Sequence, residues 1–158
     1  MIKNRGVPYA VLLMLFLAAF FNFMARDTVF GRQLYAIGGN PDAAALSGVD
    51  IRKRVMILYV VFGALTAISG IVMTSRLNAA TTSAGQGMEL DVIAASVIGG
   101  TSLMGGEGTI FGAVIGALIM ASLDNGMSLM DTNITYQYII KGMILLLAVW
   151  VDIATRKK

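Results

Sequence analysis

The chain has 158 residues, of which 57% are hydrophobic and 13% are charged. Soluble domains carry about 25% charged residues, so this composition excludes a water-soluble domain and predicts an all-α polytopic membrane protein in contact with a lipid bilayer. The chain has no cysteine and no histidine, which excludes disulfides, thiolate sites and the commonest metal ligand. The net charge of +3 is small, and we interpret it as a signal of membrane topology rather than of nucleic-acid binding.

Five apolar segments are expected to lie in the membrane, at residues 7–24, 55–74, 91–104, 110–123 and 134–151. A full helical crossing needs about 20 residues. The third and fourth segments are shorter than that, and the third can be a short, tilted or broken helix that is buried among others. Polar stretches between the segments predict loops at residues 26–54, 76–90 and 124–133, with a tight turn at 105–109.

Two of these segments carry small residues at helical spacing. Gly63, Ala67 and Gly70 form a stripe in the second segment, and Gly112 and Gly116 form a GxxxG pair in the fourth. Small residues allow membrane helices to approach each other closely. Both sets therefore predict helix-packing faces.

The longest polar stretch, residues 26–54, contains the signals of a short helix. Asn40 is a good N-cap, Pro41 suits the first helical position, and Asp42 adds negative charge near the positive end of the helix dipole. Gly48 can adopt the left-handed conformation that ends a helix. A helix of about seven residues is not stable alone in water, so it is expected to pack on its own protein or on a partner.

Cations are distributed unevenly between the two ends of the expected helices. Alternating crossings place eight of them on the side of the C-terminus: Arg26, Arg32, Arg52, Lys53, Arg54, Arg156, Lys157 and Lys158. The other side holds three: Lys3, Arg5 and Arg76. The positive-inside rule then predicts a cytoplasmic C-terminus, a cytoplasmic 26–54 loop and an external N-terminus. An external N-terminus without a cleavable signal predicts that more protein precedes Met1.

The stretch Gly100–Glu107 has the GxxxxG outline of a phosphate-binding loop. A functional loop of this kind continues with a lysine and a serine or threonine, and this chain has Gly106 and Glu107 at those positions. The sequence also shows no nucleophile–histidine pair and no cluster of metal ligands. The chain is therefore not expected to be an enzyme, nor to bind a cofactor or a metal itself.

Several polar side chains lie in or near the last two membrane segments. Lys141 lies within the last segment and can snorkel or pair with a carboxylate such as Asp124 or Glu89. Polar residues in membranes are costly and often functional, so an alternative is that Asp124, Asn125 and Gln137 line a passage. They would offer hydrogen bonds there to a polyhydroxylated solute.

Three blocks of residues, in this order, resemble the monosaccharide ABC-importer permeases of the ribose, xylose and galactose type. They are 31–40 followed by 43–48; 89–95 continuing to 99–102 and 105–109; and 122–128 followed by 136–138 and 141–142. The last block looks most like xylose permeases. The resemblance covers residues 7–158 and, because family members are about twice as long, it implies the C-terminal half of a transmembrane permease domain.

The resemblance implies a multi-pass protein of the bacterial inner membrane that pairs with a second permease subunit. An external binding protein would deliver the sugar, and two cytoplasmic ATPase subunits would bind ATP and magnesium. The ATPase would dock on the 26–54 loop through a coupling helix, whose implied docking residues are Arg32, Tyr35, Gly38, Gly39, Asn40, Pro41, Ala44, Leu46 and Gly48. ATP-driven closure would move this helix and, through it, the segments 7–24 and 55–74.

Two alternatives stay open at this point. An ion- or proton-coupled secondary transporter would use a broken helix such as 91–104, although its acids would then be expected at mid-membrane and not at segment edges. A non-transporting scaffold that only occupies an ATPase would keep the docking loop and need no solute path.

Overall fold

The computed structural model describes residues 9–79 and 85–156, which form seven helices and no strand. The helices are α1 (Tyr9–Asp27), α2 (Val29–Gly39), α3 (Pro41–Leu46), α4 (Ile51–Leu77), α5 (Met88–Ile98), α6 (Ile110–Leu129) and α7 (Ile134–Arg156). The predicted all-α class is confirmed. Within the described part of the chain, α1, α4, α6 and α7 are long and apolar enough to cross a membrane.

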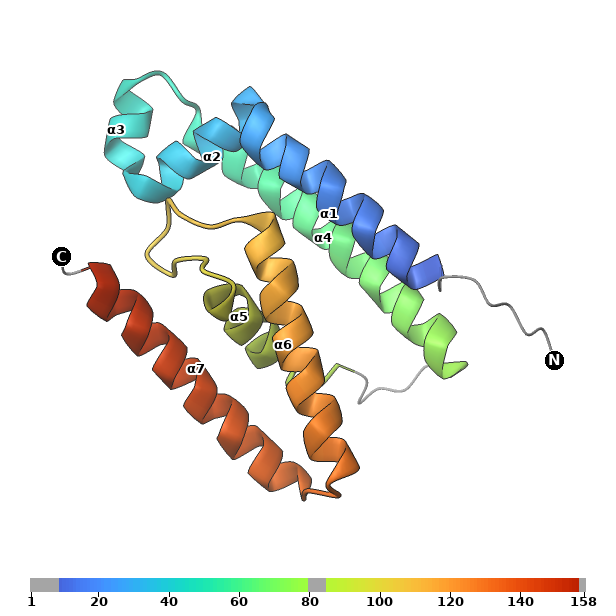
Figure 1. Cartoon of the computed structure of the whole chain (residues 1–158). Coiled ribbons are helices and arrows are strands. Elements are labelled where there is room, and N and C mark those ends of the chain that lie inside the picture. Colours follow the sequence, from blue (N-terminus) through green and yellow to red (C-terminus); the bar gives the residue numbers. More distant parts are fainter. Residues whose placement is uncertain (1–8, 80–84, 157–158) are drawn as a thin grey trace.

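The helices form two groups that meet at one end of the molecule (Figure 1). In the first group, α2 packs on α1, α3 and α4, and it lies with α3 at the upper end of the long helices α1 and α4. In the second group, α5 packs on α6 and α7, which meet each other at the lower end. Contacts between α1 and α6 join the two groups.

The third predicted membrane segment is only partly helical. α5 has 11 residues and ends at Ile98, where Gly99 and Gly100 follow and Gly100 has a φ of +84°. Residues 99–109, which we call the glycine loop, then rise to the level of α2 before α6 begins (Figure 1). The chain thus passes from one end of α6 toward the other as a short helix followed by irregular backbone. Irregular backbone at membrane depth is tolerated only where protein or water covers it.

The GxxxG pair of α6 faces α5. A methyl group added at Gly116 would overlap the carbonyl of Ala95, and one added at Gly112 would overlap the carbonyl of Gly99. Close backbone approach brings Ala95 together with Met120 and Ala94 in the best-buried apolar cluster of the described residues. The small side chains are therefore what allows α5 and α6 to pack so tightly.

The small-residue stripe of α4 has no neighbour in the described structure. Gly63, Ala67 and Gly70 are all exposed, and nothing lies within 4 Å of a methyl group built at Gly63 or Gly70. The predicted packing face of α4 is therefore unoccupied within the described residues.

Several helices are longer than the sequence predicts. α4 begins at Ile51 because the Asp50 side chain accepts a hydrogen bond from Lys53 N at 3.0 Å, so the cations at 52–54 lie in a helix and not in a loop. The predicted loop at 124–133 is wrong, since α6 continues to Leu129 and only residues 130–133 connect it to α7. Part of what the sequence predicts lies outside the described residues. This part is the start of the first membrane segment at residues 7–8, the position of the N-terminus, and the cations Lys3, Arg5, Lys157 and Lys158.

Candidate functional site

The helix α2, which the sequence did not predict, follows α1 after a sharp turn (Figure 1). Thr28 caps it, with its hydroxyl accepting a hydrogen bond from Gly31 N at 3.2 Å. Gly31 is buried, and a methyl group there would overlap the carbonyl of Ala25, so only glycine allows this turn. The signal was present in the cap and in apolar residues at helical spacing, Phe30, Leu34 and Ile37, but the glycines of the segment argued against a helix.

The predicted short helix is present as α3. The Asn40 side chain accepts a hydrogen bond from Ala43 N at 3.0 Å, Pro41 takes the first helical position, and Asp42 lies in the first turn. Gly48 has a φ of +84° and ends the segment. We call α2 and α3 together, residues 29–46, the α2–α3 elbow.

The α2–α3 elbow buries one side of α3 and exposes the other. Ala44 is only 3% exposed, whereas Leu46 is 91% exposed. In Figure 1, α3 stands at the upper end of the molecule, away from the lower ends of α6 and α7. An apolar side chain as exposed as Leu46, on a helix too short to be stable alone, is a candidate contact for a partner.

The other side of the α2–α3 elbow contacts the glycine loop. A methyl group added at Gly38 would lie 2.6 Å from Gly106 N, and one added at Gly105 would overlap the Gly38 carbonyl. The Tyr35 hydroxyl donates a hydrogen bond to the Gly108 carbonyl at 2.8 Å. These contacts hold the C-terminal half of α2 against backbone from a distant part of the chain.

The structure therefore divides the implied docking residues into two sets. One set is exposed around α3 and consists of Arg32, Asn40, Pro41, Leu46 and Gly48. The other set makes contacts within the chain and consists of Tyr35, Gly38, Gly39 and Ala44, of which Gly39 is nevertheless exposed. All nine lie on or next to the α2–α3 elbow, and most of the exposed surface comes from the first set.

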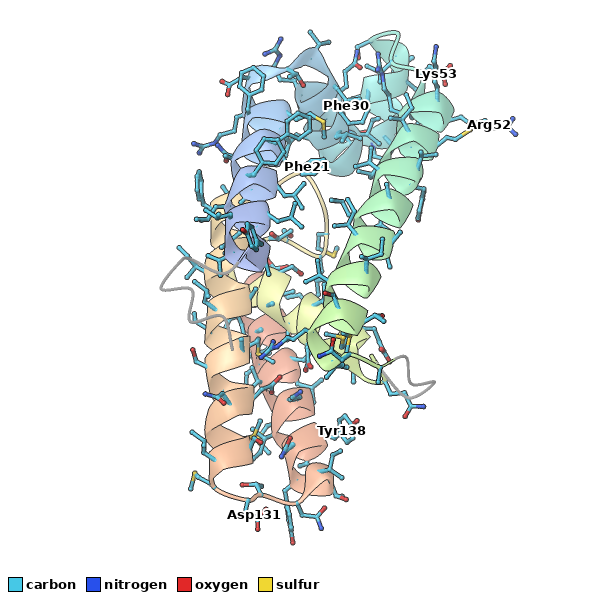
Figure 2. All side chains as sticks on the ribbon, turned by 90° about the vertical axis from the view of Figure 1, so that its right-hand side faces the viewer. Phe21, Phe30, Arg52, Lys53, Asp131 and Tyr138 are labelled. Carbon is cyan, nitrogen blue, oxygen red and sulfur yellow. The ribbon has the colours of Figure 1, made fainter. Side chains whose placement is uncertain are left out.

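Cations surround this end of the molecule. Arg52 and Lys53 are exposed in the first turn of α4, at the same end as Phe30 in Figure 2. The Arg54 guanidinium lies 5.8 Å from the centre of the Phe30 ring, which joins α4 to α2 by a cation–π contact. The exposed Leu46 thus lies at an end of the molecule where five cations, Arg26, Arg32, Arg52, Lys53 and Arg54, outnumber three acids, Asp27, Asp42 and Asp50.

An ion cluster joins the three helices of the second group. Lys141 Nζ on α7 lies 2.8 Å from Asp91 Oδ2 on α5 and 3.0 Å from Asp124 Oδ1 on α6. The predicted pairing of Lys141 with Asp124 is confirmed, while its second partner is Asp91 and not Glu89. Asp124 lies inside α6, so the expectation that the acids lie at the edges of the membrane segments is wrong for this residue.

The three residues proposed to line a solute passage do not converge. Asp124 belongs to the ion cluster, Asn125 is exposed, and Gln137 Nε2 donates a hydrogen bond to the Thr132 carbonyl at 2.9 Å in the α6–α7 connection. A cavity of about 790 Å³ does exist, but its walls come from α1, α2, α4, the glycine loop and the start of α6. None of the three residues lines it.

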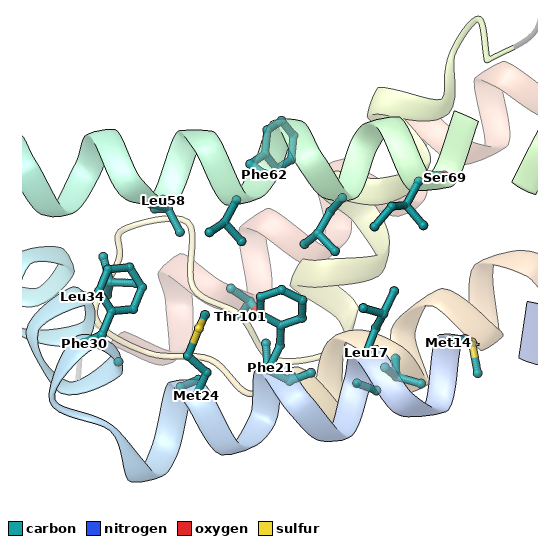
Figure 3. Close-up of a pocket in the computed structure, with 18 of the residues that line it drawn as sticks. Met14, Leu17, Phe21, Met24, Phe30, Leu34, Leu58, Phe62, Ser69 and Thr101 are labelled. Atoms are coloured by element: carbon teal, nitrogen blue, oxygen red, sulfur yellow. The ribbon is translucent and has the colours of Figure 1, made fainter. Parts of the chain in front are cut away.

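The cavity lies between α1 and α4 and is largely apolar. Figure 3 shows Leu17, Phe21 and Met24 of α1 on one side and Leu58 of α4 on the other, with Thr101 of the glycine loop nearby. Such walls offer few hydrogen bonds to a polar solute. The cavity is better suited to apolar contacts than to recognition of a sugar.

Taken together, the four membrane-length helices and the short α5 helix with the irregular backbone after it define a polytopic membrane protein, with the exposed α3 helix of the α2–α3 elbow at one end. Residues 2–149 match the family model described as the permease component of the branched-chain amino acid transport system, and the chain belongs to this family.

Similar proteins include sugar permeases. The chain is 56% identical over 154 residues to the xylose transport system permease protein XylH of Haemophilus influenzae, covering 98% of this chain and 41% of that protein. It is 55% identical to XylH of Escherichia coli K12, covering 98% of this chain and 39% of that protein. It is 48% identical to the ribose import permease protein RbsC of Escherichia coli K12, covering 95% of this chain and 47% of that protein. The chain thus spans less than half the length of these relatives, and no solved structure matched it.

Proposed function

We propose that this chain forms part of the membrane-spanning permease of an ATP-driven monosaccharide importer, of the xylose type, in the bacterial inner membrane. The proposal is supported by the relatives at 55–56% identity, which are xylose transport system permease proteins. It is also supported by the match of the sequence blocks around 31–48, 89–109 and 122–142 to sugar permeases.

In this proposal the α2–α3 elbow docks on a cytoplasmic ATPase, and the observation that carries it is the exposure of Leu46. Leu46 stands 91% exposed on a helix whose opposite side is anchored through Ala44. Arg32, Asn40 and Pro41 are also exposed on the α2–α3 elbow. ATP and magnesium belong to the partner ATPase.

The hydrogen bonds of α7 support a cytoplasmic C-terminus. Asp152, near the end of α7, accepts hydrogen bonds from Leu103 N and Ser102 Oγ, each at 3.2 Å. These residues belong to the glycine loop, which also contacts α2. The end of α7 and the α2–α3 elbow therefore lie at the same end of the molecule, and the positive-inside rule assigns that end to the cytoplasm.

Transport would follow from movement of the elbow. Closure of the ATPase subunits would displace α3, and α2 would pass the displacement to α1 and α4, on which it packs. The exposed stripe Gly63, Ala67 and Gly70 on α4 would receive another helix of the transporter. The remaining partners are a second permease subunit and an external sugar-binding protein.

The docking assignment is tested with two exposed leucines at opposite ends of the molecule. Leu46→Asp places a charge in the proposed interface. The matched control Leu129→Asp changes an 81% exposed leucine at the end of α6, next to the α6–α7 connection in which Asp131 is labelled in Figure 2. A hot-spot side chain contributes about 2 kcal/mol or more, so ATPase affinity should fall at least about 30-fold for Leu46→Asp. Co-purification from membranes is the measurement, with membrane abundance as the reference.

Equal ATPase binding by the two variants would refute docking through α3. Uptake into proteoliposomes then separates the alternatives. Uptake that follows the ion gradient and not ATP would identify a secondary transporter. ATPase binding without any uptake by the full transporter would identify a scaffold.

A further inference from the structure

The glycine loop connects the two groups of helices by backbone contacts. Gly38 at the end of α2 faces Gly106, with so little space that an added methyl group would lie 2.6 Å from Gly106 N. Gly105 and Gly106 have φ values of +90° and +77°, which suit glycine, and both lie against α2 backbone. No side chain therefore separates the α2–α3 elbow from the glycine loop at this contact.

Side-chain hydrogen bonds fix the glycine loop on both sides of the glycine contact. On one side, Tyr35 of α2 donates to the Gly108 carbonyl at 2.8 Å. On the other side, Asp152 of α7 accepts from Ser102 Oγ and Leu103 N. The loop is also closed on itself, since Ser102 N donates to the Glu107 carbonyl at 3.0 Å. The loop is thus fastened to α2 and α7, and its ends continue into α5 and α6.

We propose that the glycine loop is a rigid strut that carries displacement of the α2–α3 elbow to α5, α6 and α7. The inference rests on the proposed function and deepens it, because the movement would reach the second group of helices directly and not only through α1 and α4. Gly38, Gly105 and Gly106 act as positioning residues. Backbone in direct contact has no rotamers that could absorb a displacement, and tightly packed interiors transmit strain.

The end of α2 offers a matched pair of substitutions. Gly38→Ala adds a methyl group that would press on Gly106, whereas at Gly39 the nearest atom to an added methyl group is the Gly106 Cα at 4.0 Å, an ordinary contact. Both residues belong to α2, neither has a positive φ, and both substitutions change helix propensity equally. Tyr35→Phe removes the hydrogen bond to Gly108 without adding volume.

The experiment measures sugar imported per ATP hydrolysed by the complete transporter in proteoliposomes, together with ATPase co-purification. Gly38→Ala should bind the ATPase normally but lower the ratio of sugar to ATP at least about 5-fold, the lower end of typical coupling between sites. Gly39→Ala should keep the unsubstituted ratio. Tyr35→Phe should lower the ratio less than Gly38→Ala. A merely structural role would lower the amount of protein in the membrane and leave this ratio unchanged.

The strut proposal is refuted if Gly38→Ala leaves the ratio of sugar to ATP unchanged, or if Gly38→Ala and Gly39→Ala give the same ratio. If Gly38→Ala does not accumulate in the membrane, Tyr35→Phe decides: a lowered ratio supports the strut and a normal ratio overturns it. Absence of ATP-driven uptake by the unsubstituted transporter would instead refute the proposed function, so the two failures are distinguishable.

Discussion

Removal of the Lys141 ammonium group is expected to destabilise the packing of α5 on α6 and α7. Lys141 is 12% exposed and is shared by the carboxylates of Asp91, 21% exposed, and Asp124, 37% exposed. Within the described residues, Asp91 Oδ1 is buried without a hydrogen-bond partner, so Lys141 provides the main compensation for that charge. Lys141→Met would leave two neighbouring carboxylates without a counter-charge.

The magnitude follows from burial. Removing one partner of a buried ion pair costs about 3–5 kcal/mol. At about 2–4 °C per kcal/mol for a chain of this size, Tm should fall by about 6–20 °C. Asp91→Asn should lower the free energy of unfolding less than Lys141→Met does, because Lys141 still pairs with Asp124. Asp124→Asn should cost least, about 1 kcal/mol or below, because Asp124 is the most exposed of the three.

The assay is thermal unfolding of the purified protein in detergent, followed by the loss of the monodisperse peak in size-exclusion chromatography. Lys141→Arg is the control, since it keeps the positive charge and can contact both carboxylates. The expected order of Tm is Lys141→Arg, Asp124→Asn, Asp91→Asn and then Lys141→Met, from highest to lowest. A Tm for Lys141→Met within about 2 °C of the unsubstituted protein would refute the argument, as would a lower Tm for Asp124→Asn than for Asp91→Asn.

Two further predictions concern local packing and capping. Gly116→Ala should lower Tm, because overpacking against the Ala95 carbonyl lowers the free energy of unfolding by about 1–3 kcal/mol. Gly126→Ala on the same helix has nothing within 4 Å of the added methyl group and should be neutral or stabilising by up to about 1 kcal/mol. Equal shifts in Tm for the two variants would contradict the close α5–α6 contact. Asn40→Ala should reduce the stability of α3 by about 1 kcal/mol and speed amide hydrogen exchange across Pro41–Leu46. The control Asp50→Ala removes the α4 cap and should leave exchange in α3 slow. Unchanged exchange in Asn40→Ala would show that the cap does not stabilise α3.

The α2–α3 elbow illustrates how local signals succeed and fail. Asn40, Pro41 and Gly48 predicted α3, because capping and termination depend on neighbouring backbone groups only. The same reasoning missed α2, because Gly31 and Gly38 are poor helix formers. The structure shows why they are glycines: each lies where other backbone comes too close for a side chain. Helix propensity describes single residues and registers neither contact, and the contact between Gly38 and Gly106 joins residues that are distant in sequence.

The polar residues of α6 and α7 give the same lesson for the candidate site. Asp124 looked like the start of a loop because a charge usually ends a membrane segment, yet it lies within α6 because Lys141 compensates it. Pairing of Lys141 with Asp124 was one of the alternatives that the sequence left open, while the partnership with Asp91 required the position of α5. The residues proposed for a solute path were chosen by polarity, and polarity alone does not place side chains in one cavity.

The sequence by itself determined the membrane class, the all-α fold, the short α3 helix and the resemblance to sugar permeases, because composition, hydrophobic run length and cap chemistry are properties of contiguous residues. The tertiary structure decided that α5 stops at Ile98, that the glycine loop meets the end of α2, and that the implied docking residues divide into an exposed and an internal set. These features depend on backbone segments about 70 residues apart approaching without side chains between them, and no local pattern encodes which segments will meet.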